Sequence, residues 1–233
     1  MGKRKQIILF IVEGVSEEEA LGLGLSRIFV DKEVRIEVTY GDVTTSPGSN
    51  SGNIKAKVGN IVRNFAGQTY KPKDFLKVIH VMDTDGAYLS DQYIFSNSKR
   101  AKTYYTENGI ETADKESICK RNHNKALLMN ILWSMHTVWR TIPYEAYYMS
   151  SNLDHVLYDT PNLSDDEKYK KAEWFCRQYA EVPQKFLDFF QQNDFAILGD
   201  YNKTWKFIAR DMNSVRRYSN FGVFLNNMTH HTV

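Results

Sequence analysis

Two acidic segments of the sequence follow apolar runs and have residue types that could bind a metal. Glu13-Gly14 follows the apolar run 7–12, and Asp83-Thr84-Asp85-Gly86 follows the mainly apolar run 78–82. Mg²⁺ is held in proteins by a few carboxylates, together with water and substrate phosphates. Two aspartates one residue apart repel one another unless a cation or a proton intervenes. We therefore expect Asp83 and Asp85 to bind a divalent metal.

Glu13 is the third carboxylate of this pattern and has two chemical roles open to it. It could be a metal ligand, or a general acid or base near the metal. The competing interpretation is a solvated acid at a helix N-terminus, where the helix dipole favours negative charge. Asp85-Gly86 is likewise good turn chemistry. Neither segment alone favours the metal interpretation. It is favoured because both acidic segments follow strands that are expected to be buried.

These acids must be positioned by the elements around them. The run 6–12 is apolar on both faces, which is typical of a central parallel strand. Ser16 and Glu19 have the capping-box spacing, so a helix is expected from about 17 to 29. Further strands are expected at 34–38, 75–82 and 144–149, further helices at 54–65, 125–140, 165–180, 183–192 and 203–212, and loops at 44–53 and 85–124.

The order of these elements predicts an α/β fold with a doubly wound, mostly parallel sheet. In such sheets, ligands bind outside the carboxyl ends of the strands. The three carboxylates are therefore expected at one edge. We expect residues 1–154 to form this α/β domain and residues 155–233 to form a helical extension that packs on it.

Composition narrows the possible classes of protein. The chain has 233 residues, 25% of them charged, with a net charge of +2, so gross charge does not indicate a nucleic-acid binder. Cys119 and Cys176 lie far apart without the spacing of a zinc site, which favours a reduced, cytoplasmic protein. No run approaches the roughly 18–20 apolar residues that a membrane span needs. The sequence contains neither a phosphate-binding loop with Gly-Lys-Ser/Thr nor a Gly-x-Ser-x-Gly nucleophile elbow.

Basic residues near the C-terminus could contact nucleic acid. Lys203, Arg210, Arg216 and Arg217 alternate with hydroxyl, amide and aromatic groups, a composition that suits phosphate contacts and base stacking. The alternative is a solvated helix face with Trp205 in the core. Lys99, Arg100 and Lys102 could likewise line a nucleic-acid groove, and the favoured alternative places them on the surface of a loop.

Over about residues 6–150 the chain resembles the Toprim domain. The resemblance is carried by an apolar strand that ends in Glu13-Gly14, an acidic helix start, and a later apolar strand that ends in Asp83-x-Asp85. The resemblance implies a Rossmann-like sheet that uses Mg²⁺ (or Mn²⁺) for phosphoryl transfer on nucleic acid. It implies that Glu13 is an acid/base or a ligand, and that Asp83 and Asp85 bind the metal.

More narrowly, the chain resembles small stand-alone Toprim-like proteins of the OLD, RloB and abortive-infection types. In those proteins a Ser-Asn and an acid often follow a later strand, a place that Ser151-Asn152 and Asp154 occupy here. Asp154 is therefore a further candidate metal ligand. Glu17 and Glu18, in the first helix, are further candidates, because a carboxylate often lies near that point in the family and the adjacent acids leave the choice open.

The resulting expectation is a Mg²⁺-dependent nuclease that hydrolyses phosphodiester bonds in DNA or RNA and serves defence against phage or plasmids. Its expected partners are nucleic acid and either a protein or further copies of itself. A second interpretation is a non-catalytic Toprim-like module that binds nucleic acid or a partner within a defence or mobile-element complex. A response-regulator-like or HAD-like fold is disfavoured, because its first strand would normally end in aspartate rather than Glu13-Gly14.

Overall fold

The computed structural model describes residues 5–229, which form two compact units that alternate along the chain. Unit 1 contains the chain up to Met82 together with Leu128–Tyr147 and Tyr169–Phe186. Unit 2 contains Asp83–Leu127, Tyr148–Lys168 and the chain from Leu187 onward. The segment that follows residue 154 therefore contributes to both units.

The central sheet has five strands in the order β2-β1-β3-β8-β7. Strand β1 is parallel to both β2 and β3, and β7 is antiparallel to β8. The strands are β1 (Ile7–Val12), β2 (Glu33–Val38), β3 (Phe75–Asp83), β7 (Thr137–Val138) and β8 (Ile142–Met149). Every side chain of β1 is buried, as its uninterrupted apolar run predicts. The expected α/β class with a mostly parallel sheet is thus confirmed.

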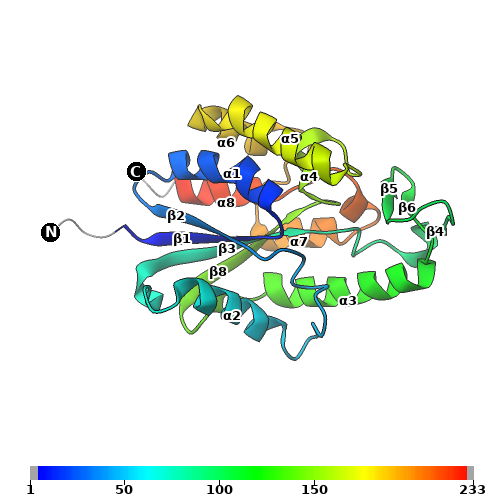
Figure 1. Cartoon of the computed structure of the whole chain (residues 1–233), viewed down its shortest axis with the longest axis horizontal. Helices are drawn as coiled ribbons and strands as arrows, with labels where there is room; N and C mark the ends of the chain where they lie inside the picture. Colours follow the sequence, from blue (N-terminus) through cyan, green and yellow to red (C-terminus); the bar gives the residue numbers. More distant parts are fainter. Residues whose placement is uncertain (1–4, 230–233) are drawn as a thin grey trace. The chain divides into compact units, whose positions relative to one another are not determined.

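Helices α1 (Val15–Ile28) and α2 (Ile54–Ala66) cover opposite faces of this part of the sheet (Figure 1). The chain leaves β1 toward β2 on one side and returns past β1 to β3 on the other. Right-handed crossovers in opposite directions place the two connecting helices on opposite faces. The direction of winding therefore changes between β1 and β3, and in open α/β sheets the ligand crevice lies at the carboxyl ends of such a strand pair.

The start of α1 differs from the expectation. The helix begins at Val15 with Gly14 at the N-cap position and without a side-chain cap. The Ser16 hydroxyl instead donates to the Glu17 carboxylate at 3.1 Å. The predicted Ser16 cap is therefore wrong, because the helix already begins one residue before Ser16.

Gly24 of α1 allows the close approach of Phe186, within unit 1. A Cβ atom at Gly24 would lie 2.3 Å from the Phe186 ring, whereas a Cβ at Gly59 of α2 would meet nothing within 4 Å. We expect Gly24→Ala to lower the free energy of unfolding by about 1–3 kcal/mol, because overpacking outweighs the gain in helix propensity. Gly59→Ala is the matched control and should raise it by about 0.5–1 kcal/mol. Urea unfolding of both variants measures the difference, and a stabilised Gly24→Ala would contradict this packing.

Residues 85–124, expected as a long loop with short helices, contain a second sheet. Strands β4 (Ile94–Ser96), β5 (Tyr104–Thr106) and β6 (Gly109–Thr112) lie in the order β4-β6-β5. The prediction was wrong because strands of three or four residues show too little alternation to be detected. Their apolar side chains pack together in a small core formed by Leu89, Ile94, Tyr105, Ile110 and Val215.

The helices also differ in part from the expectation. Helix α3 (Lys115–Trp133) begins ten residues earlier than predicted and ends before β7. Helices α4 (Leu153–Tyr158) and α8 (Phe221–Thr229) were not predicted. The others are α5 (Asp165–Phe175), continued by a π-helical turn at Cys176–Ala180, α6 (Pro183–Gln192) and α7 (Tyr201–Ile208). Within residues 5–229, no helix has the length and apolar character needed to cross a membrane.

Candidate functional site

The acidic segment at the end of β3 is held firmly within unit 2. Asp83 accepts a hydrogen bond at 2.9 Å through Oδ1 from the backbone N–H of Leu153, at the start of α4. Thr84 is fully buried and donates through Oγ1 to the carbonyl of Ser214 at 2.7 Å. The backbone N–H of Asp85 donates to the carbonyl of Ser151 at 2.7 Å. These bonds fix the direction in which both carboxylates leave the backbone.

The Asp85 carboxylate is the acceptor of a charged, largely buried network. Its Oδ2 lies 2.6 Å from Nζ of Lys125, a side chain with no exposed surface. Its Oδ1 accepts from the Tyr105 hydroxyl at 2.7 Å. Arg121 donates to the Asp85 carbonyl at 2.8 Å. The backbone of Asp85 is left-handed, with φ of 49°, a conformation that aspartate tolerates better than most residues.

These neighbours decide the charge of the network. Burial acts to raise the pKa of Asp85, but the positive charges of Lys125 and Arg121 outweigh it and hold that pKa below its ordinary value. Burial and the adjacent carboxylate raise the pKa of Tyr105 well above its ordinary value. Asp85 is therefore ionised, Lys125 is its counter-ion, and the Tyr105 hydroxyl is protonated and donates.

The two aspartates fit a divalent metal to different degrees. Asp83 accepts a hydrogen bond from a neutral backbone N–H through Oδ1, and its carboxylate is of the type that binds hard cations. Both oxygens of Asp85 accept short hydrogen bonds, one of them from the Lys125 ammonium. Asp85 would therefore have to share its charge between a metal and Lys125. Within residues 5–229, no three His, Cys, Asp or Glu side chains are grouped as a ready-made metal site.

The other predicted ligands are distributed over both units. Asp154 is buried in α4, and its Oδ2 lies 3.5 Å from Nζ of Lys168. Glu13 directly follows β1 and is partly buried in unit 1. Glu17 belongs to the same unit, and its carboxylate folds back over Gly14, where a Cβ atom would lie 2.8 Å from Oε2. Gly14 therefore makes room for the Glu17 carboxylate at the start of α1.

Asp85 lies in the lining of a cavity of about 570 Å³ in unit 2. The same lining contains four basic residues, Lys99, Arg100, Lys102 and Lys168, and two further acids, Asp165 and Glu167. The sequence left the first three basic residues open between a nucleic-acid groove and a loop surface, and the fold places them in one cavity lining with Asp85. The contributions of Tyr105, Arg121 and Lys125 to this site were missed, because they lie 20 to 40 residues after Asp85 and carry no local signal.

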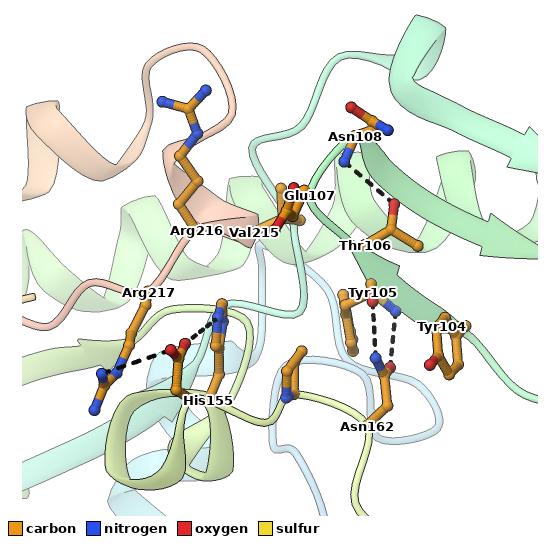
Figure 2. A pocket seen from close by; sticks show the side chains of 12 residues that line it. Tyr104, Tyr105, Thr106, Glu107, Asn108, His155, Asn162, Val215, Arg216 and Arg217 are labelled. Carbon is orange, nitrogen blue, oxygen red and sulfur yellow. Dashed lines mark hydrogen bonds and ion pairs between the residues drawn. The ribbon is translucent and has the colours of Figure 1, made fainter.

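A second cavity of about 770 Å³ in unit 2 contains two of the predicted basic residues, Arg216 and Arg217. Figure 2 shows Arg217 beside His155, whereas Arg216 stands clear of the other labelled side chains. Arg217 donates to the carbonyl of Val156 at 2.8 Å and lies 4.0 Å from the Asp159 carboxylate. Burial lowers the pKa of His155, which favours its neutral form.

The other two predicted basic residues, Lys203 and Arg210, line a third cavity of about 330 Å³. Lys206 lies between them in sequence, and the lining includes no acidic residue. Trp205 is buried and stacks edge-on against Tyr148, so it belongs to the core and is not presented to a ligand. The four predicted basic residues thus occupy two separate cavities of unit 2.

No family model, no curated protein and no solved structure matches this chain. The resemblance to Toprim proteins therefore rests on the residues that carry it, and the function has to be inferred from the geometry of the site.

Proposed function

We propose that the protein is a divalent-metal-dependent phosphodiesterase that cleaves nucleic acid and resembles Toprim nucleases. The observation that carries the proposal is the position of Asp83-x-Asp85. The pair lies at the end of β3, one of the two strands at the switch point of the sheet, and Asp85 lines a cavity that contains four basic side chains. Carboxylates beside lysines and arginines suit a phosphodiester, since the basic groups attract the phosphates and the acids hold the cation.

Asp83 is the ligand that the proposal relies on most, because it is the last residue of β3, at the switch point of the sheet, and the resemblance assigns it to the metal. When bound, Mg²⁺ or Mn²⁺ would polarise the phosphate and stabilise charge on the leaving oxygen. Lys99 and Lys102 would hold phosphates of the substrate at the cavity. Lys125 and Tyr105 would hold the Asp85 carboxylate in place. Asp85 would be a second metal ligand beside Asp83, and its negative charge would then be shared between the metal and Lys125.

The remaining predicted ligands keep the roles that the resemblance implies. Glu13 is proposed to act as general acid or base, and Glu17 and Asp154 as further ligands. The proposed setting, defence against phage or plasmids, likewise follows from the resemblance. The deciding experiment is a cleavage assay with Mg²⁺ and Mn²⁺ on plasmid, single-stranded DNA and RNA, in which Asp83→Asn is compared with the unaltered protein.

The third cavity supports nucleic acid as the partner. Lys203 and Lys206 are exposed on α7, and the exposed Arg210 lies just beyond the end of this helix in the same cavity lining. Replacing Lys203 and Arg210 together by Gln is expected to weaken nucleic-acid binding about equally for all sequences. The slope of log K against log salt should fall by about 0.7 to 0.9 for each phosphate that the variant no longer neutralises. Anisotropy titrations between low and moderate salt measure this slope, and an unchanged slope would remove the third cavity from the binding surface.

A second function, a non-catalytic binding module, is favoured by one specific observation. Asp85 is already neutralised by Lys125 at 2.6 Å, an arrangement that is complete without a metal. Such a module would bind nucleic acid through the same basic cavities and give no product with Mg²⁺ or Mn²⁺. The cleavage assay separates the two functions directly.

A further inference from the structure

The first two cavities of unit 2 adjoin one another at a ridge. Both linings contain Tyr104, Tyr105, Pro161 and Asn162. The Tyr105 backbone N–H donates to the Asn162 side-chain oxygen at 2.8 Å, and the Asn162 amide donates back to the Tyr105 carbonyl at 2.7 Å. Figure 2 shows this reciprocal pair. Asn162 thus pairs with Tyr105 at the open edge of β5, the edge that faces away from β6, and fixes the ridge.

Tyr104 presents an aromatic ring on this ridge. The side chain is about one-third exposed, at 36%. The guanidinium of Arg100 lies 3.6 Å from the centre of the ring, and Arg100 is itself held by Glu111 at 2.7 Å. The cation covers one face of the ring and holds it in a defined orientation. Within the described part of the chain no other ring or cation contacts Tyr104, so the exposed part of the ring can stack on a planar group.

Cations without a side-chain partner lie on both sides of the ridge. Lys99 and Lys102 line one cavity and Arg216 lines the other, and all three are exposed or partly exposed. Within the described part of the chain, none of the three side chains makes an ion pair or a hydrogen bond. An anionic ligand can therefore bind them without displacing a protein group.

The acids in the two linings are mostly committed to protein partners. Asp85 is paired with Lys125, and Asp159 lies near Arg217 and His155. Glu167 accepts hydrogen bonds from the hydroxyl and the backbone N–H of Ser164. The other acidic residues in the two linings are Glu107 and Asp165.

We propose that this ridge binds single-stranded nucleic acid, with one base stacked on Tyr104 and with phosphates at Lys99 or Lys102 on one side and at Arg216 on the other. The inference rests on the proposed nucleic-acid substrate and specifies its form. Proteins that bind single strands combine a positively charged groove with aromatic rings on which bases stack. In a duplex the bases are already stacked and paired, so the Tyr104 ring selects for the single strand.

Binding without cleavage tests the inference. A fluorescently labelled 15-nucleotide strand and its duplex are titrated with the full chain in EDTA, and anisotropy is recorded. The single strand is expected to bind at least tenfold more tightly than the duplex. Tyr104→Ala should weaken single-strand binding by about 5- to 150-fold, the range for loss of one base–aromatic stack, and Tyr104→Phe should retain it. Equal affinity for strand and duplex, or an unchanged Tyr104→Ala, would overturn the proposal.

Charge variants test the two sides of the ridge separately. Lys102→Gln and Arg216→Gln should each reduce the salt slope of single-strand binding by about 0.7, while Glu107→Gln should tighten binding. Lys120→Gln is the matched control, because Lys120 is exposed in α3 and lines neither cavity. If Lys102→Gln and Arg216→Gln have the same salt slope as Lys120→Gln, the single strand does not bind at the ridge.

These outcomes are independent of catalysis. Selective single-strand binding in EDTA, together with no product in Mg²⁺ or Mn²⁺, would uphold the ridge and refute the proposed nuclease. Metal-dependent cleavage by a protein that binds single strand and duplex equally would support the proposed nuclease and refute the proposed ridge.

Discussion

Asp83→Asn is expected to abolish metal-dependent cleavage of nucleic acid while leaving the fold intact. The substitution keeps the shape of the side chain and its oxygen acceptor for the N–H of Leu153, but removes the charge that attracts the cation. Lewis-acid stabilisation contributes several kcal/mol to such a reaction, and each 1.4 kcal/mol is a factor of ten, so the rate should fall by roughly a thousandfold. Initial rates of oligonucleotide cleavage, measured with saturating Mn²⁺, give this ratio.

Asp211→Asn is the matched control for the loss of one negative charge. Asp211 is exposed, has a left-handed backbone with φ of 49° that asparagine also accepts, and lines none of the three cavities. Its cleavage rate should stay within about twofold of the unaltered protein, because surface substitutions away from a site have small effects. Glu13→Gln should lose activity as Asp83→Asn does, if Glu13 has the role that the resemblance implies. Retained metal-dependent cleavage in both Asp83→Asn and Glu13→Gln would exclude the proposed mechanism.

Metal binding can be followed apart from the reaction. An ion that binds the folded protein alone raises its unfolding free energy by RT ln(1 + [L]/Kd), which is about 2.7 kcal/mol at 100 times Kd. Thermal unfolding with increasing Mn²⁺ should show this stabilisation in the unaltered protein and in Asp211→Asn, but not in Asp83→Asn. Stabilisation of the same size in all three would mean that the ion binds away from Asp83.

The sequence predicted the parts of the fold whose signal is local and long. Strand β1 has an uninterrupted apolar run, and β3 has a nearly uninterrupted one, so their burial and their place in a parallel sheet followed from composition. The small sheet of unit 2 was missed because its strands have three or four residues. In those strands the stabilising contacts come from apolar residues distant in sequence, such as Leu89 and Val215.

The site, too, could be predicted only in part from the sequence, because its contacts join residues that are distant along the chain. Asp85 was identified from its neighbours in sequence, but what controls its chemistry is a lysine 40 residues later on α3. Lys125 looked like the first residue of an amphipathic helix, because the ten preceding helical residues are mostly polar. A pairing between two such residues is set by the path of the chain and cannot be read from spacing. The short turn at Asn213–Val215 likewise separates Arg210 from Arg216 and assigns them to different cavities.

Lys125→Met is expected to destabilise the protein more than any of the other substitutions. It leaves the Asp85 carboxylate, only 24% exposed, without the ammonium that now lies 2.6 Å away. Breaking a buried pair by removing one partner typically costs about 3–5 kcal/mol, and the partial exposure of Asp85 places the expected loss near the lower value. Urea unfolding measures it. Lys77→Met is the matched control, because the Lys77–Glu145 pair has a similar separation, 2.7 Å, but is more exposed at the carboxylate and should contribute less than about 1 kcal/mol.

The double variant Asp85→Asn/Lys125→Met separates the pair from the packing of the lysine. It should be more stable than Lys125→Met alone, because the uncompensated charge is gone, and adding Asp85→Asn alone completes the cycle that gives the coupling between the two residues. If the double and single variants are equally unstable, Lys125 contributes through its buried chain and not through its charge.

The same variant tests whether Asp85 can serve as a metal ligand. In the unaltered protein Lys125 occupies the position of a cation at this carboxylate, so a metal ion and the ammonium compete for one charge. With the ammonium removed, Mn²⁺ should stabilise Lys125→Met more than it stabilises the unaltered protein, and the gain should vanish in the double variant. A Mn²⁺ response that Lys125→Met leaves unchanged would remove Asp85 from the ligands and leave it as the structural partner of Lys125. The metal proposal would then rest on Asp83, whose described hydrogen bond to the Leu153 N–H does not involve Lys125.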